Sequence, residues 1–180
     1  MKNILIGVCG GISCYKVIDI ANILTKMGFN VNVIMTENAC KFITPLIFQT
    51  LTKNEVIVNM FDKHEGFDVK HISLATKADL VLVAPATANI IGKIANGIAD
   101  DMLTSTLLAA KCPILVAPAM NDNMYSNSIV QDNLKKLEKF GFHIIEPQEG
   151  NLACGTIGKG KLASKETILN KVKELLNWKI

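Results

Sequence analysis

The stretch DLVLVAPA, residues Asp79–Ala86, indicates the fold class of this chain. Its apolar residues follow one another without polar alternation, which is typical of a strand buried on both faces of a parallel sheet. CPILVAPAM, at Cys112–Met120, has the same character and repeats the letters VAPA. The repetition indicates that two strands of one sheet end in equivalent ways.

Shorter apolar strands are expected on either side of these runs, at Asn3–Cys9, Asn30–Met35 and Phe142–Pro147. Three helical patterns with apolar residues on one face lie between and after the strands. The first covers Ser13–Met27 and ends before Gly28. The second carries Val130, Leu134 and Leu137 and ends before Gly141, and the third carries Ile168, Val172, Leu175 and Leu176. Alternation of this kind predicts an α/β fold: a single doubly wound, Rossmann-like domain over residues 1–180, with a parallel sheet and helices on both faces.

Composition narrows the class of function. The chain has 180 residues and a net charge of +3. Hydrophobic residues make up 49% of it, and we expect this high share to fill buried strands and a subunit interface. The lysines are scattered and there are only two Tyr and one Trp, so no nucleic-acid face is visible. No apolar run approaches the roughly 18–20 residues of a membrane span. We therefore expect no nucleic-acid partner and no membrane partner.

The five cysteines form an odd set without a C-x-x-C pair. This pattern argues against a disulfide scaffold and against a zinc site, so no metal is expected. It favours a reducing, cytoplasmic setting.

Ligands of doubly wound folds bind beyond the carboxyl ends of the strands, which directs attention to three loops. In CGGIS (Cys9–Ser13), Gly10 and Gly11 either make a tight turn or let the backbone approach a phosphate at a helix N-terminus. The loop matches neither G-x-G-x-x-G nor a Walker A motif. Thr36, after the second strand, can offer a hydroxyl to the same phosphate, although its spacing favours helix capping.

The other two loops carry amides and small residues. In APATANI, Thr87 and Asn89 can hydrogen-bond the polar edge of a flat ring, and the small neighbours leave room for it. In APAMNDNM, Asn121 can donate to a carboxylate or can start a helix. His71, in VKHISL, is either a surface histidine or a catalytic one.

The stretch GNLACGTIGKGK, Gly150–Lys161, contains four glycines and no strand or helix period. Such composition is typical of turns and loops. It predicts either a linker or a mobile substrate flap, over about residues 148–162, that carries the thiol of Cys154.

Four motifs occur in order along the chain: HISL, PATANIIGKIANGIADDMLT, APAMNDNMY and GNLACGTIGKGK. Together they resemble the flavin-containing cysteine decarboxylases, over nearly the whole chain from Gly10 to Lys161. The resemblance implies FMN bound between the subunits of a homotrimer, or of a homododecamer built from four trimers. By position it implies FMN contacts from Gly10, Gly11, Ile12, Thr36, Thr87, Ala88, Asn89, Ile90 and Ala119.

The same resemblance implies an enzyme, a carboxy-lyase, that converts 4′-phosphopantothenoylcysteine to 4′-phosphopantetheine in coenzyme A biosynthesis. The substrate thiol is oxidised, CO₂ leaves, and the ene-thiol is reduced again. His71 would be the active-site histidine, Asn121 would hold the carboxylate, and Cys154 would supply the proton for the final reduction. The implied substrate contacts are Asn121, Met124, Ala153 and Cys154.

Two alternatives remain open. One is a peptidyl-cysteine decarboxylase or flavin prenyltransferase of the same fold, against which the GNLACG flap argues. The other is a non-catalytic flavin-binding regulatory subunit, whose relatives carry acidic tails that this chain lacks. Gly11 stands where many relatives have Ser, and Tyr125 stands where Trp is common. The chain ends at Ile180, as expected of a stand-alone decarboxylase or of a segment of a bifunctional protein.

Overall fold

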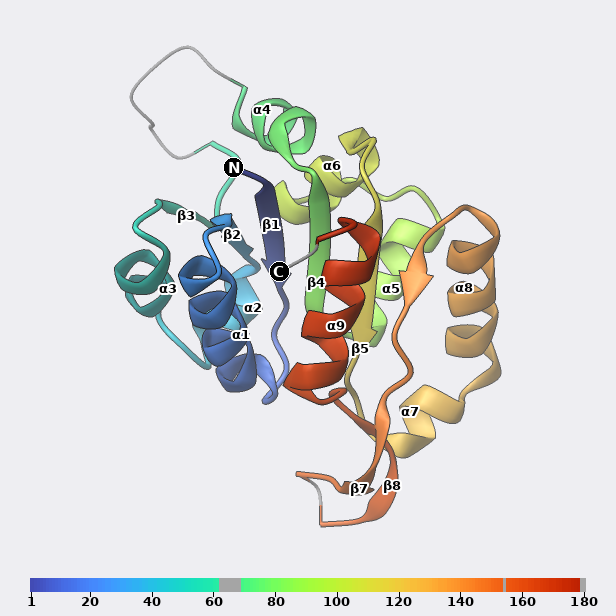
Figure 1. The fold of residues 1–180 in the computed structure, drawn as a ribbon. Helices are drawn as coiled ribbons and strands as arrows, with labels where there is room; N and C mark the ends of the chain where they lie inside the picture. Colours follow the sequence, from blue (N-terminus) through green and yellow to red (C-terminus); the bar gives the residue numbers. More distant parts are fainter. Residues whose placement is uncertain (62–68, 154, 179–180) are drawn as a thin grey trace.

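A parallel sheet forms the centre of the molecule (Figure 1). The computed structural model describes residues 1–61, 69–153 and 155–178. In this described part, six strands lie in the order β3-β2-β1-β4-β5-β6, and neighbours pair in parallel throughout. Their bounds are β1 (Asn3–Val8), β2 (Asn30–Met35), β3 (Val56–Ile57), β4 (Leu80–Ala86), β5 (Ile114–Pro118) and β6 (His143–Ile144). The predicted doubly wound α/β fold is therefore confirmed.

Helices cover both faces of the sheet. They are α1 (Cys14–Lys26), α2 (Glu37–Cys40), α3 (Pro45–Thr52), α4 (Lys70–Lys77), α5 (Ala88–Ala95), α6 (Met102–Ala109), α7 (Asp122–Ser126), α8 (Ser128–Lys139) and α9 (Lys165–Leu175). Ile4 and Ile6 of β1 pack with α1, α3 and α9, whereas Leu5 packs with α5, α6 and α8 on the other face. Because both faces are covered, the central strands need apolar residues at every position.

The long buried strands were well predicted from the sequence. Every residue of β4 is buried, as is every residue of β5, which explains the continuous apolar runs. The expected fifth strand is shorter than Phe142–Pro147, because β6 pairs with β5 only at His143 and Ile144.

Part of the stretch from Gly150 to Lys161, whose composition is typical of turns and loops, is strand. Residues Gln148–Asn151 (β7) and Ile157–Lys161 (β8) form an antiparallel hairpin, separate from the central sheet. Most of its residues are exposed, and backbone hydrogen bonds pair the two strands. The face of β8 that packs against the rest of the chain carries Gly158 and Gly160, so the strand buries no large apolar side chain there and shows no apolar alternation.

Among the described residues, no helix combines the length and the apolar character needed to cross a lipid bilayer.

Candidate active site

A cavity of about 860 Å³ opens at the carboxyl ends of the strands. The three loops singled out from the sequence all contribute to its wall, together with the segment after β2. It lies where the strand order reverses between β1 and β4, the usual ligand position in a doubly wound sheet. The predicted cofactor and substrate residues among its lining are Gly10, Gly11, Thr36, Thr87, Ala88, Asn89, Ile90, Ala119 and Met124.

The two glycines after β1 differ in what a side chain would meet. A Cβ atom on Gly10 would lie 2.5 Å from Cβ of Asn38 and 2.8 Å from its carbonyl carbon, so the loop packs directly on α2. A Cβ atom on Gly11 would lie 3.7 Å from side-chain atoms of Pro85 and Thr87, an ordinary contact. Close backbone packing therefore requires glycine at position 10, whereas position 11 has room for a small side chain.

We expect Gly10→Ala to lower the free energy of unfolding by about 1–3 kcal/mol, because its methyl group must displace backbone atoms of Asn38. Gly11→Ala, the same change one residue later, is the matched control and should stay within about 0.5 kcal/mol of the wild type. Urea denaturation of the three proteins measures both effects. Equal losses in the two variants would contradict this assignment.

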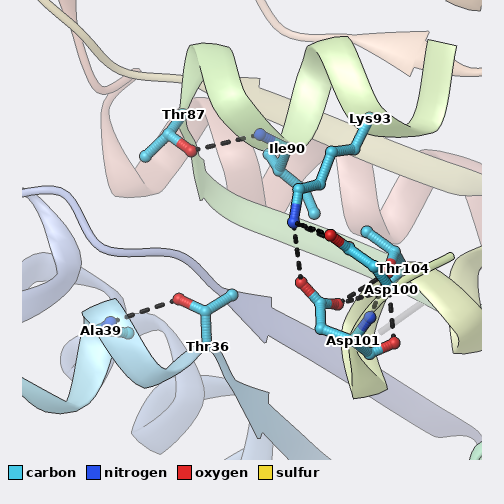
Figure 2. Close-up of polar contacts among 8 residues, drawn as sticks. All are labelled: Thr36, Ala39, Thr87, Ile90, Lys93, Asp100, Asp101 and Thr104. Carbon is cyan, nitrogen blue, oxygen red and sulfur yellow. Dashed lines mark hydrogen bonds and ion pairs between the residues drawn. The ribbon is translucent and has the colours of Figure 1, made fainter. Parts of the chain in front are cut away.

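Two threonine hydroxyls in the cavity wall cap short helices, as Figure 2 shows. Oγ1 of Thr36 accepts a hydrogen bond from the backbone N–H of Ala39 at 3.2 Å, which confirms the predicted cap. Oγ1 of Thr87 accepts from the N–H of Ile90 at 3.4 Å. A hydroxyl that accepts in this way keeps its own O–H for donation. Capping and ligand binding are therefore compatible at both positions.

A charged cluster borders the same cavity and was missed in the sequence (Figure 2). Nζ of Lys93, on α5, lies 2.7 Å from Oδ1 of Asp100 and 3.6 Å from Oδ2 of Asp101. Asp101 in turn forms a capping box with Thr104 at the start of α6. The hydrogen bond from Lys93 holds the pKa of Asp100 below its usual value. The ammonium group of Lys93 thus links α5 to both carboxylates of the α5–α6 connection.

Methionines form much of the apolar wall. Five of the chain's seven methionines line the cavity within the described residues: Met35, Met60, Met102, Met120 and Met124. Thioether side chains are flexible and polarizable, and they pack well against aromatic rings. Together with the small side chains of Ala88 and Ala119, the methionines give the cavity an apolar wall that could accommodate a flat aromatic ligand. The family resemblance had pointed to Met124, whereas no local period marks the other four methionines.

Asn121 starts α7 at the edge of the cavity, between the lining residues Met120 and Met124. Its Oδ1 accepts hydrogen bonds from the backbone N–H groups of Asn123 at 3.0 Å and Met124 at 3.4 Å. The expected helix start is therefore confirmed. The cap also fixes the orientation of the amide, with Nδ2 as its donor end.

Other predicted site residues lie elsewhere in the described chain. His71 is on α4, which Figure 1 shows at the opposite end of the sheet from α7 and the hairpin. Its helix borders a second hollow of about 320 Å³ beside the amino ends of β1 and β2. Ile12 is 54% exposed and is absent from the cavity lining, as is Ala153, which follows β7. Cys154 lies outside the described residues.

Cys9, at the end of β1, contributes a buried thiol to the cavity wall. Burial raises its pKa to about 12, so the thiol stays protonated near neutral pH. A protonated, buried thiol is a packing group and a poor nucleophile. Within the described ranges, no group of three or more His, Cys, Asp or Glu side chains could hold a metal ion.

The fold and the cavity define an α/β protein with a candidate ligand site at the switch point of its sheet. Residues 1–177 match the model of the family described as Flavoprotein. The chain belongs to this flavoprotein family.

Two curated relatives are similar along most of this chain. It is 46% identical over 177 residues to a "Probable phosphopantothenoylcysteine decarboxylase" of Streptococcus mutans, covering 97% of this chain and 99% of the relative. It is 51% identical over 168 residues to the "Coenzyme A biosynthesis bifunctional protein CoaBC" of Bacillus subtilis, covering 93% of this chain. The chain spans only 41% of that relative and 45% of its Borreliella burgdorferi counterpart.

Solved structures agree with this placement. A "PPC decarboxylase" mutant complexed with pantothenoylaminoethenethiol superposes with a TM-score of 0.87 at 29% identity, over 98% of both chains. The structure of SpaF, one of the "FMN-dependent Cysteine Decarboxylases", superposes with a TM-score of 0.85 at 32% identity, again over 98% of both chains.

Proposed function

We propose that this protein is an FMN-dependent decarboxylase that converts 4′-phosphopantothenoylcysteine to 4′-phosphopantetheine in coenzyme A biosynthesis. One observation carries the proposal: 46% identity along nearly the full length of both this chain and the Streptococcus mutans relative. The structural likeness to a PPC decarboxylase supports it further. We also propose a cytoplasmic location, in line with the unpaired cysteine pattern.

The cavity residues fit a flavin mononucleotide. Gly11 leaves space for a phosphate near the amino end of α1, and the hydroxyl of Thr36 lies in the same wall. Thr87 to Ile90, Ala119 and the methionines would surround the ring system. Bound FMN supplies the two-electron oxidation of the substrate thiol and its later reversal.

The protein's own residues position the substrate and move protons. Loss of CO₂ needs an electron sink next to the carboxylate, which the oxidised thiol carbon provides. We propose that Nδ2 of Asn121 holds the carboxylate in place without adding a charge that would stabilise it. His71 would act as base or orient the reacting group, and Cys154 would protonate the ene-thiol as it is reduced.

We further propose that residues 148–162 form a substrate flap that covers the cavity during the reaction. The hairpin projects from the same end of the sheet as α7, so it can approach a substrate held by Asn121 (Figure 1). A covering segment of this kind would exclude water while the reactive ene-thiol exists.

The position of His71 supports an oligomer in which neighbouring subunits share each site. Within one subunit, α4 and the cavity lie toward opposite ends of the sheet. Val69 and Ile72 beside His71 are 57% and 47% exposed, which suits burial against another copy. We therefore propose a homotrimer, or a homododecamer of trimers, in which His71 of one subunit serves the cavity of the next.

The direct test of the function uses the purified protein. We expect a yellow protein with an FMN spectrum that releases CO₂ from 4′-phosphopantothenoylcysteine. A peptide ending in cysteine is the control substrate, because SpaF shows that this fold also serves other cysteine decarboxylases. Turnover of the peptide alone would favour the peptidyl-cysteine alternative, and bound flavin without turnover of either would favour a regulatory subunit.

Sharing of the site between subunits is tested by mixing two inactive variants. His71→Asn and Asn121→Ala are each expected to lose activity while the oligomer persists. After unfolding and refolding together in equal amounts, about a quarter of the sites should contain both native residues and regain activity. Light scattering confirms assembly. Continued inactivity of well-assembled mixtures would contradict the shared site.

A further inference from the structure

The β7–β8 hairpin is seated directly on the chain segment that leads into α7. The backbone N–H of Met120 donates to the carbonyl oxygen of Gly160 at 2.9 Å. A Cβ atom on Gly158 would lie 2.6 Å from Cβ of Asp122, and one on Gly160 would collide with the Met120 carbonyl oxygen. The two glycines of β8 therefore let the hairpin lie against the residues that flank Asn121.

Between these glycines, Lys159 joins three separate parts of the structure. Its Nζ lies 5.6 Å from the ring centroid of Tyr125, on α7, and forms an ion pair with Glu146. The hydroxyl of Tyr125 donates to Oε2 of the same Glu146 at 3.0 Å. Glu146 lies just before β7, so the three side chains connect both strands of the hairpin to α7.

The protonation states suit these contacts. Burial, and to a smaller extent the hydrogen bond to Glu146, raises the pKa of Tyr125 to about 12. The hydrogen bond from Lys159 lowers the pKa of Glu146. Near neutral pH the phenol is therefore a donor and the carboxylate is an ionised acceptor, which makes a charge-assisted hydrogen bond.

We propose that Tyr125, Glu146 and Lys159, here called the hairpin anchor, are positioning residues that set the place of the hairpin relative to Asn121. The short helix α7 has Asn121 as its N-cap and contains Tyr125. A shift at the base of the hairpin is thus passed to the side chain that starts the helix. The kinetic consequence of this proposal rests on the proposed function, whereas its structural part does not.

Hydrogen exchange of the full-length protein, followed by mass spectrometry, tests the anchor without any substrate. Tyr125→Phe removes only the hydroxyl, and Lys159→Gln removes the cation. Each should raise the exchange rates of the β7 and β8 amides by about three- to ten-fold, as expected for loss of one such contact. Lys171→Gln breaks a comparable surface ion pair on α9 and is the matched control, with no change expected in the hairpin.

Two further variants separate an anchor from general loosening. Lys159→Arg keeps the charge and the contact with the ring, so its hairpin should exchange as in the wild type. The double variant Tyr125→Phe/Glu146→Gln should raise the exchange rate by less than the product of the increases in the two single variants. Both changes break the same hydrogen bond, so their effects are not independent. The proposal would be overturned if the hairpin amides of Tyr125→Phe and Lys159→Gln exchanged at the wild-type rate. It would also be overturned if those of Lys159→Arg exchanged as fast as those of Lys159→Gln.

The kinetic arm uses the same proteins. Tyr125→Phe should lower kcat for decarboxylation several-fold with an unchanged flavin spectrum, while Lys171→Gln keeps the wild-type kcat. Faster hairpin exchange with wild-type kcat would overturn the link from anchor to Asn121. If the wild type itself turned over no substrate, the proposed function would fail, and the exchange results would still decide on the anchor.

Discussion

Asn121→Asp is expected to leave the fold intact while abolishing nearly all decarboxylation. Asp is as good an N-cap as Asn, so its carboxylate can accept the two hydrogen bonds that start α7. We expect the free energy of unfolding to stay within about 0.5 kcal/mol of the wild type. Activity should fall by about two to three orders of magnitude, because the new carboxylate repels and displaces that of the substrate.

Asn121→Ala is the companion variant. It removes the cap as well as the amide donor, so it should lose about 1 kcal/mol of stability in addition to the activity. Urea denaturation and CO₂ release measure the two effects separately. If the Asp variant stayed active while the Ala variant did not, Asn121 would serve only as a helix cap, and the proposed contact with the carboxylate would be wrong.

Cys154→Ser is expected to change the product of the reaction. In the proposed reaction, oxidation of the substrate and loss of CO₂ do not use the Cys154 thiol, so both should proceed. A thiol has a reference pKa of about 8.5, whereas a hydroxyl is a far weaker acid, so protonation of the ene-thiol should fail. Mass spectrometry should then show a product two hydrogens lighter than 4′-phosphopantetheine. The PPC decarboxylase in the similar solved structure, a cysteine-to-serine mutant, holds pantothenoylaminoethenethiol.

Cys112→Ser provides the control for this change. Cys112 is a half-buried free cysteine at the amino end of β5, whereas the cavity loops lie at the carboxyl ends of the strands. Its variant should form the ordinary product at the wild-type rate. If Cys154→Ser also formed 4′-phosphopantetheine at a similar rate, Cys154 would have no catalytic role. The stretch GNLACGTIGKGK would then contain no catalytic thiol.

Some elements of the fold leave a clear pattern in the sequence and others do not. β4 and β5 were recognised because burial on both faces forces apolar residues into consecutive positions. The helices α2 and α7 span only four and five residues, too few for a helical period, and their start is signalled only by the caps Thr36 and Asn121. The hairpin leaves no apolar pattern in the sequence, because its strands rely on backbone pairing and β8 packs against the chain through Gly158 and Gly160.

The amino-acid pattern was enough to predict the parallel sheet and the loops that meet at its carboxyl edge. Long apolar runs must be buried, and successive parallel strands bring their ends to one edge. Which other residues complete the cavity, and which lie away from it, depends on how the helices pack in three dimensions. The Lys93 cluster and the methionines meet there because helices from separate crossovers pack together. The helix α4, which carries His71, lies at the other end of the sheet because it leads directly into the amino end of β4.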